Sequence, residues 1–288
     1  MVGCPSPIDY ASSSSQSFNI LHLLPTRRLS PSYTMTTNIP VIHLLCMEDK
    51  YIDALSRALT TLNPERATLT DRVSIIMHNT SLSFLPQTSN FDLIVSPANS
   101  YGRLDGGFDD AISRAFCRPP EHPYDTLTKA AQAALYAKWR GFAPPGTCTL
   151  VPFPQELLKA DGSGDNKWGC KWVAICPTMR TPDDVRWDRE VVYECVWSLL
   201  CAVEGWNRDV DENQTGEQRI RSILVTPIAT GCGKVSPERW ATQFVLAIKH
   251  FVDAVENPER WRNLGWKEIY DDMLEVQRTW KVDGDSEA

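Results

Sequence analysis

The sequence predicts an α/β fold, a three-layer α/β/α sandwich with a mixed central sheet. Short apolar runs alternate with longer segments of helical periodicity along residues 39–256, which is typical of a sheet covered by helices on both faces. Two polar loops that contain glycine each follow an apolar run and precede a helix. The chain has 288 residues, of which 42% are hydrophobic and 23% charged, so it can bury a sizeable core.

Six apolar runs are expected to be strands, because they are short, rich in Val, Ile and Leu, and bounded by polar or proline-containing turns. They are residues 41–47, 73–77, 91–96, 148–151, 172–176 and 223–226. Apolar residues at helical spacing predict helices over residues 50–60, 109–116, 126–139, 190–204 and 240–255. Ser236 followed by Pro237 is typical of a helix start. Residues 160–166 are expected to be a surface turn and residues 208–218 a solvated loop.

The two ends of the chain differ from this alternating pattern. Residues 1–38 contain a serine run, several prolines and few charges, so we expect a disordered or processed tail that precedes a domain of residues 39–256. An organellar targeting signal within residues 1–34 stays an alternative, although the prolines interrupt any amphipathic basic helix. Residues 257–288 hold three tryptophans and are expected to form a helical extension packed on the domain, followed by an acidic end.

Charge and cysteine content limit the possible partners. The net charge is −7 and the pI is about 5.3, so direct nucleic-acid binding is not expected. The nine cysteines include no CxxC pair, which favours reduced thiols in a cytoplasmic or nuclear protein over a structural zinc site. The longest apolar run near the N-terminus is far too short to span a membrane. We therefore expect no metal, no cofactor and no membrane contact, and leave the oligomeric state open.

The first candidate site segment is residues 94–112, in which an apolar strand leads into a polar loop and then a helix. Asn99 follows the strand with an amide that can both donate and accept hydrogen bonds. Gly106 and Gly107 let the backbone approach a ligand closely, and the first helical turn presents unpaired N–H groups. Asp109 lies at this helix start, where it either stabilises the helix or points into a cleft. Capping of a turn is likewise the plainer interpretation of Asn99.

The second segment, residues 224–237, repeats this order of strand, glycine loop and helix. Its loop from Thr230 to Gly233 can wrap a diphosphate with backbone N–H groups, but it lacks the spacing of a Walker loop or of a dinucleotide-binding G-x-G-x-x-G motif. Two such loops predict one cleft at the carboxyl ends of the strands. Cys232 has no histidine or other base near it in sequence, so it is not expected to act as a nucleophile.

Both segments resemble signatures of the macro domain family. Residues 96–99, Ser-Pro-Ala-Asn, and residues 105–112, Asp-Gly-Gly-Phe-Asp-Asp-Ala-Ile, are similar to its N-A-A-N and G-G-G-V-D-x-A-I motifs. Residues 228–233, Ile-Ala-Thr-Gly-Cys-Gly, resemble its second loop, S-T-G-x-x-G. Residues 177–185 resemble a P-T-M-R-x-P-x-D-V stretch of a branch found in phages and bacteria. The resemblance covers about residues 39–256.

The resemblance implies a protein that binds ADP-ribose or an ADP-ribosylated protein and hydrolyses ADP-ribose from the modified protein or from an ADP-ribose derivative. It assigns the distal ribose and the reacting water to two catalytic residues, Asn99 and Asp109. It implies ligand contacts by Asn79, Ser96, Ala98, Gly106, Gly107, Phe108, Thr230, Gly231, Cys232, Gly233 and Lys234. A pure ADP-ribose reader and a phosphatase acting on a related nucleotide metabolite stay open as alternatives.

The chain departs from the family pattern within these motifs. Asn79 stands where the family usually has an aspartate that reads the adenine amino group, Ser96 replaces the first Asn of N-A-A-N, and Asp105 replaces a glycine. Only Cys232 separates the glycines of the second loop, so Gly233 stands where an aromatic residue often flanks the distal ribose. These departures concern the substrate and the rate rather than the fold.

Three residues near the motifs carry open alternatives. Arg180 is expected either to reach a phosphate or to pair with Asp183 or Asp184. Tyr101 and Trp187 could flank the base of a nucleotide, although packing is the commoner role of a tryptophan near a helix.

Overall fold

The computed structural model describes residues 39–62, 69–117, 119–158, 166–214 and 216–280. Within them, six strands form one sheet in the order β2-β1-β6-β3-β5-β4. Neighbouring strands are parallel except β4 and β5, which are antiparallel. The strands are β1 (Val41–Cys46), β2 (Ile75–Asn79), β3 (Leu93–Ser96), β4 (Thr149–Pro152), β5 (Trp172–Ile175) and β6 (Ser222–Val225). The sheet is mixed, as the sequence predicts.

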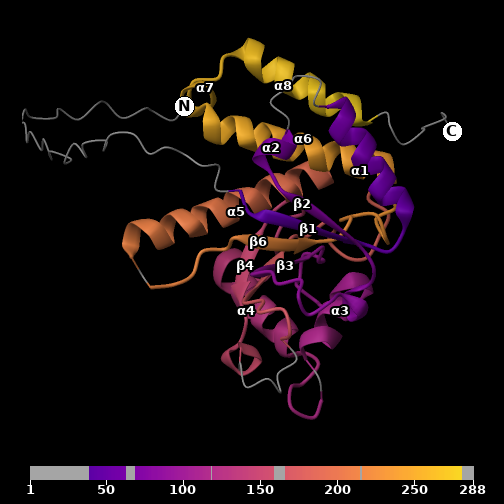
Figure 1. Ribbon diagram of the computed structural model, residues 1–288, viewed down its shortest axis with the longest axis vertical. Helices are drawn as coiled ribbons and strands as arrows, with labels where there is room; N and C mark the ends of the chain where they lie inside the picture. The colour runs from indigo at the N-terminus through magenta and orange to yellow at the C-terminus, as the bar shows by residue number, and fades with distance from the viewer. Residues whose placement is uncertain (1–38, 63–68, 118, 159–165, 215, 281–288) are drawn as a thin grey trace, which may run out of the picture. The chain divides into compact units, whose positions relative to one another are not determined.

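Helices cover both faces of the sheet, so the predicted three-layer α/β/α sandwich is confirmed (Figure 1). One face carries α1 (Asp49–Thr61), α5 (Val191–Asn213) and α6 (Pro237–Glu256). The other face carries α3 (Gly107–Phe116) and α4 (Thr126–Trp139). Short elements between them are α2 (Leu69–Arg72), η1 (Leu82–Phe84) and η2 (Gln155–Leu158).

The pleat of the strands divides the core into two clusters. Leu44 packs in the cluster under α1, α5 and α6, whereas its neighbour Leu45 packs in the cluster on the side of α3 and α4. Val225 and Leu224 of β6 divide in the same way. Because successive side chains of a strand point to opposite faces, a strand covered on both faces favours apolar residues at most positions. This explains why the strands are predominantly apolar runs in the sequence.

Helix α5 is longer than the sequence predicts, and the expected loop over residues 208–218 is wrong for its first part. The helix continues to Asn213. Polar residues suggested a loop, but here they lie along the solvent side of a helix. The ion pair between Arg208 and Glu204, one turn apart, is typical of such a helix surface.

Strand β2 begins two residues later than predicted and includes Asn79. The N–H of Val73 still bonds to the carbonyl oxygen of Leu69 at 2.8 Å, in the helical pattern of α2. Residues 75–79 then pair in parallel register with residues 42–46 of β1. Asn79 is therefore the last residue of a strand at the edge of the sheet.

Two further helices follow the last helix of the sandwich. Helices α7 (Pro258–Arg262) and α8 (Trp266–Arg278) follow α6, and Arg260 joins all three by ion pairs to Asp253 at 2.6 Å and Asp272 at 2.9 Å. The expected tail (1–38), the acidic end (281–288) and the turn at 160–166, except Asn166, lie outside the described residues. Among the described helices, none has the length and apolar character needed to cross a bilayer.

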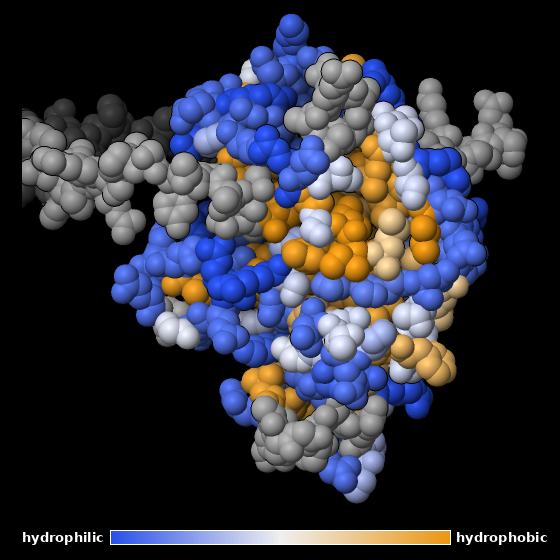
Figure 2. All heavy atoms as spheres, in the orientation of Figure 1, coloured by the Kyte–Doolittle hydropathy of each residue, from blue (hydrophilic) through white to orange (hydrophobic). Residues whose placement is uncertain are grey.

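The edge of the sheet at β2 is the most apolar part of the surface seen in Figure 2, where hydrophobic side chains gather over β1 and β2. Ile76 and Met77 of β2 are each 42% exposed. Because β2 has a neighbour on one side only, its outer backbone groups are not paired within the sheet.

We expect Asn207→Ala to destabilise the fold by about 2–3 kcal/mol. The buried Asn207 side chain of α5 bonds to the carbonyl oxygen of Ile220 at 2.8 Å and accepts from its N–H at 2.7 Å, so its loss leaves two backbone groups without partners. Urea unfolding measures the loss. The exposed Asn213→Ala is the control, expected within about 0.5 kcal/mol of the parent protein; equal stability of both variants would contradict the expectation.

Candidate functional site

A cleft of about 420 Å³ lies at the carboxyl ends of β3, β5 and β6. These strands are neighbours in the sheet, so the loops that follow them meet at one edge. The lining residues are Pro97, Ala98, Asn99, Arg103, Asp105, Gly106, Gly107, Phe108, Asp109, Thr178, Met179, Pro182, Thr226, Pro227, Ala229, Thr230, Gly231, Cys232 and Gly233. Both predicted glycine loops therefore contribute to one site.

Asn99 organises the loop after β3. Its Oδ1 accepts hydrogen bonds from the backbone N–H of Tyr101 at 3.0 Å and of Arg103 at 3.4 Å, and its Nδ2 donates to the carbonyl oxygen of Arg103 at 2.9 Å. The turn-capping role is thus present. The amide has a second hydrogen, and since Asn99 lines the cleft, this hydrogen is available to a ligand.

The first turn of α3 forms the adjoining wall of the cleft. Gly106 is the residue before the helix and Gly107, with φ of +56°, is its first residue. Glycine is favoured there because a side chain at positive φ is strained. The first N–H groups of a helix lack partners within it, so residues 107 and 108 bring unpaired donors and the positive end of the helix dipole to the cleft.

Asp109 is a buried carboxyl group at the base of this wall, with 7% of its surface exposed. Its Oδ1 accepts a hydrogen bond from the hydroxyl of Ser96, at the end of β3, at 2.7 Å. Burial raises the pKa of Asp109 to about 7; Asp105 adds to the rise and the Ser96 hydrogen bond opposes it. Near neutral pH both the protonated and the ionised form of Asp109 are therefore populated.

The loop after β6 is a tight turn closed by its own backbone. The N–H of Val235 donates to the carbonyl oxygen of Ala229 at 3.1 Å, and the hydroxyl of Thr230 donates to the carbonyl oxygen of Pro227 at 2.8 Å. Gly233 has no room for a side chain, since a Cβ there would stand 2.4 Å from the Ala229 oxygen. A Cβ on Gly231 would meet nothing within 4 Å.

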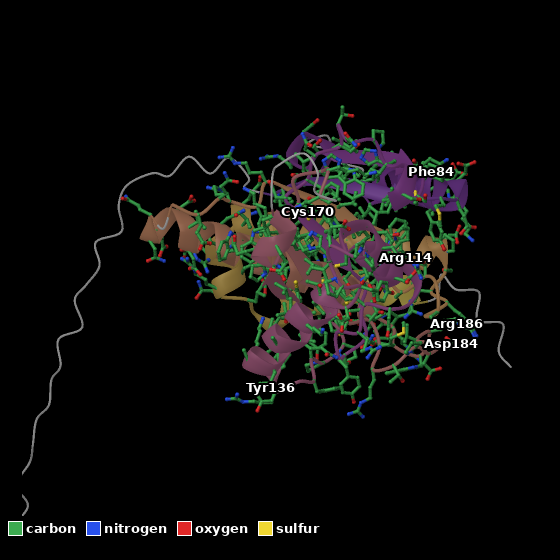
Figure 3. The ribbon with its side chains drawn as sticks, turned by 90° about the horizontal axis from the view of Figure 1, so that it is seen from below. Phe84, Arg114, Tyr136, Cys170, Asp184 and Arg186 are labelled. Carbon is green, nitrogen blue, oxygen red and sulfur yellow. The ribbon has the colours of Figure 1, made fainter. Side chains whose placement is uncertain are left out.

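The loop after β5 completes the cleft and settles the partner of Arg180 in this structure. The Arg180 Nε donates to the hydroxyl of Tyr101 at 3.2 Å, and its guanidinium lies 4.7 Å from the centre of the Phe142 ring. Asp184 pairs instead with Arg186 at 2.7 Å, beside it in Figure 3, and with Lys234 at 3.4 Å. Hydrogen bonds from Arg186 are the main cause that lowers the pKa of Asp184.

A second pocket of about 410 Å³ adjoins the cleft and shares Gly107, Phe108 and Thr226 with it. It extends towards the ends of β1 and β2, where Leu45, Cys46, Met47, Thr80, Ser81 and Leu82 contribute to its lining. Asn79 precedes this segment and donates a hydrogen bond from Nδ2 to Asp49 at 2.6 Å. The two pockets together form an elongated site.

The structure brings most of the predicted site residues together. Those that line the cleft are Ala98, Asn99, Gly106, Gly107, Phe108, Asp109, Thr230, Gly231, Cys232 and Gly233. Three others lie outside its lining: Ser96 is fully buried behind Asp109, Lys234 pairs with Asp184, and Asn79 stands near the second pocket.

The lining also contains residues that the sequence did not single out as ligand contacts. Thr178 and Met179 belong to the segment of residues 177–185 that resembles the P-T-M-R-x-P-x-D-V stretch, and an isolated β-bridge joins Met179 to Asn99. Arg103 and Asp105 pair with each other at the cleft wall. The signal available in the sequence was their position, since Arg103 lies between residues 96–99 and 105–112 and Asp105 begins the second of these segments.

The described cysteines are all free thiols. Six of them are buried and only Cys201 and Cys232 are exposed. Among the described residues, no group of three or more His, Cys, Asp or Glu is arranged to hold a metal ion.

The sequence matches no protein-family model and no curated protein. Solved structures similar to the chain are macrodomains. A mutant macrodomain of Oceanobacillus iheyensis with ADPR is 16% identical, with a TM-score of 0.40 and coverage of 68% of this chain and 89% of that chain. The same macrodomain with ADP is 15% identical, with a TM-score of 0.39 and coverage of 68% and 87%.

The macrodomain of Mycobacterium tuberculosis DarG is 19% identical, with a TM-score of 0.36, and the match covers 60% of this chain and 91% of that chain. The function proposed below rests on the residues of the cleft rather than on these similarities.

We expect Gly233→Ala to lower stability by about 1–3 kcal/mol, because the added Cβ would collide with backbone and force the second loop to shift. Gly231→Ala, two residues away in the same loop, meets open space and is the matched control for stability. Thermal unfolding of the two variants is the measurement. A Gly233→Ala variant that melts with the parent protein would show that the loop is not packed as described.

Proposed function

We propose that the chain is a macro domain that binds ADP-ribose in this cleft and hydrolyses it from a modified protein or from an ADP-ribose derivative. The observation that carries the proposal is Asp109, a buried carboxyl group whose pKa is raised to about 7, at the wall of a cleft that is formed largely by the loops after β3, β5 and β6.

Backbone geometry supports the binding of a diphosphate. The start of α3 supplies unpaired N–H groups on one side, and the loop of residues 229–233 supplies backbone on the other. Hydrogen bonds from backbone donors hold an anion without a dense set of basic side chains. This explains how a chain of net charge −7 can take a diphosphate.

The second pocket supports a nucleotide rather than a small anion. An ADP-ribose molecule has an adenine at one end, a diphosphate in the middle and a second ribose at the other end. With the diphosphate at Gly107 and Phe108, which both pockets share, the adenine would enter the pocket beside Thr80 and Ser81 and the distal ribose would approach Asn99. The Asn79 amide is held by Asp49, which leaves its Oδ1 as the acceptor for an adenine amino group.

The chemistry follows from where Asp109 stands. Asn99 would orient the distal ribose through its remaining amide hydrogen, and ionised Asp109 would take a proton from a water that attacks the anomeric carbon. The bond from that carbon to the leaving group breaks, the leaving group takes its electron pair, and the proton that Asp109 accepted passes to the leaving group, which returns Asp109 to its ionised form. A base with a pKa near the working pH is the most effective at such a step. Ser96 would act as a positioning residue, since it holds Oδ1 of Asp109.

Arg180 favours a second candidate, a phosphatase acting on a phosphate monoester of a related nucleotide metabolite. Its guanidinium is held beside the first loop by Tyr101 and Phe142, and none of the described carboxylates pairs with it. A guanidinium in that state is suited to a phosphate.

Calorimetric titration with ADP-ribose tests the binding proposal. We expect saturable binding that persists in Asp109→Asn, because backbone donors rather than this carboxyl group hold the diphosphate. Release of ADP-ribose from an ADP-ribosylated protein, or of phosphate from a monoester, then separates the two activities. Absence of binding at millimolar ADP-ribose would overturn the proposal, and binding without release of either product would leave a reader.

The pH dependence of kcat/KM tests the role of Asp109. The rate is expected to rise with pH through about pH 7 and then level off, because only the ionised carboxyl group accepts a proton. Asp109→Asn is expected to lower kcat by about 10²–10⁴-fold. Ser96→Ala removes the hydrogen bond that holds the pKa of Asp109 down, so its midpoint moves to higher pH. An unmoved midpoint in Ser96→Ala would exclude Asp109 as the titrating group.

The free energy of unfolding should also depend on pH, because ionisation of the buried Asp109 carboxyl group destabilises the folded protein. The folded protein holds the Asp109 proton up to about pH 7, against an ordinary pKa of 3.8, so the stability that this proton contributes is present below about pH 4 and lost as pH rises to 7. Asp109→Asn cannot ionise, so its stability relative to the parent protein should rise by about 2–4 kcal/mol between pH 4 and pH 8.

Asp110→Asn is the control for this measurement by urea unfolding at a series of pH values. Hydrogen bonds from Arg114 and Tyr124 lower the pKa of Asp110, so its removal should shift the pH dependence in the opposite direction. A relative stability of Asp109→Asn that does not change with pH would contradict the raised pKa.

A further inference from the structure

An open groove of about 510 Å³ lies outside the cleft, between the loop before β4 and helices α5 and α7. Its lining includes Gly146 and the residues on either side of it, Glu194 and Trp197 of α5, and Trp261 of α7. None of these residues belongs to a motif that resembles the macro domain signatures.

The aromatic side chains of the groove form one fixed surface. The Trp197 ring lies between Tyr193, at 6.2 Å and an interplanar angle of 17°, and Trp261, at 5.4 Å and 32°. The Tyr193 hydroxyl is bonded to His250 at 3.0 Å, and the Trp261 Nε1 donates to Asp253 at 2.7 Å. Because their polar atoms are already bonded, these two rings offer a ligand mainly apolar surface and π-electrons.

A carboxyl group without a partner stands in the same groove. The Glu194 side chain lies over Gly146, where a Cβ would be 2.5 Å from its Oε2, so the absence of a side chain at Gly146 makes room for it. Of the described side chains, none donates a hydrogen bond to Glu194 or forms an ion pair with it. Partial burial raises the pKa of Glu194, and the negative charges of Asp188 and Glu190 add to the effect.

The basic residue at the rim of the groove is already engaged. The Arg260 guanidinium lies 5.2 Å from the centre of the Trp261 ring and pairs with Asp253 and Asp272. It shows within this chain how a guanidinium binds between a tryptophan and carboxylates. Glu194 and Trp197 likewise place a carboxylate and an aromatic ring in one groove, but no cation of the described residues pairs with them.

We propose that this groove binds the side chain of a lysine or arginine of a polypeptide partner. The aliphatic part of that side chain would lie along Trp197, and its charge would meet Glu194. A cation gains from both the ring and the carboxylate, whereas the excess of acidic groups here repels nucleic acid and anionic lipid.

The position of the groove suits a partner that also reaches the cleft. The N–H of Gly146 bonds to the carbonyl oxygen of Pro177 at 2.9 Å, and residues 178 and 179, next along the chain, line the cleft. The two sites are therefore separated by one backbone segment. The assignment of the groove does not depend on what the cleft binds or hydrolyses.

The test uses the full chain labelled with ¹⁵N and three probes: Nα-acetyl-lysine amide, Nα-acetyl-arginine amide and the uncharged Nα-acetyl-norleucine amide. We expect the indole N–H signals of Trp197 and Trp261, assigned from Trp→Phe variants, to shift in a saturable way with the lysine or arginine probe. The norleucine probe should produce no such shift. Equal shifts with norleucine, or no saturable shift with either cation, would overturn the proposal.

Two variants of α5 carboxylates sharpen the result. Glu194→Gln is expected to weaken binding of the cationic probes about ten-fold or more, because it removes the charge and keeps the shape. Glu204→Gln, on the same helix but paired with Arg208 at 3.1 Å, should bind as the parent protein does. Matching thermal unfolding of the variants confirms that they fold. Unchanged binding in Glu194→Gln would refute the proposal, and since ADP-ribose is absent from this assay, its outcome is separate from that of the proposed function.

Discussion

The hydrogen bond between Ser96 and Asp109 joins the buried end of β3 to the first turn of α3, and the site depends on it. A carboxyl group away from water is costly when ionised, and this one receives a single hydroxyl donor from the described residues and no cation. It therefore keeps its proton at higher pH than an exposed aspartate does. The stability of the fold favours the protonated form of Asp109, whereas the proposed hydrolysis needs the ionised form. Stability and activity therefore place opposite demands on this residue.

Topology explains why this carboxyl group faces a ligand site. Strands β6, β3 and β5 are adjacent and parallel, so their loops converge at one edge of the sheet. The bridge between Asn99 and Met179 joins the loops after β3 and β5. In the loop after β6, Gly233 allows the backbone to pack closely against the carbonyl oxygen of Ala229. The proposed binding in the cleft would thus use backbone geometry that the sheet fixes. The acidic groove at Glu194 and Trp197 stands on the far side of the same β5 loop.

Local signals account for what the sequence predicts correctly. Helix α4 and the strand positions follow from periodicity and apolar runs, and both loops follow from glycines placed between a strand and a helix. The length of α5 was missed because a polar helix surface and a solvated loop have the same composition. The pairing of Arg180 with Tyr101, and the raised pKa of Asp109, depend on distant parts of the chain that meet only in the fold. No spacing in the sequence encodes that burial.

Direct titration of the Asp109 carboxyl group tests the central claim most plainly. Its ¹³C resonance, assigned by comparison with Asp109→Asn, can be followed between pH 3 and pH 9. The account predicts a midpoint near pH 7, set by burial and moderated by Ser96. A midpoint near the ordinary value of 3.8 would mean that water reaches the group freely. The proposed general base would then lose its physical basis.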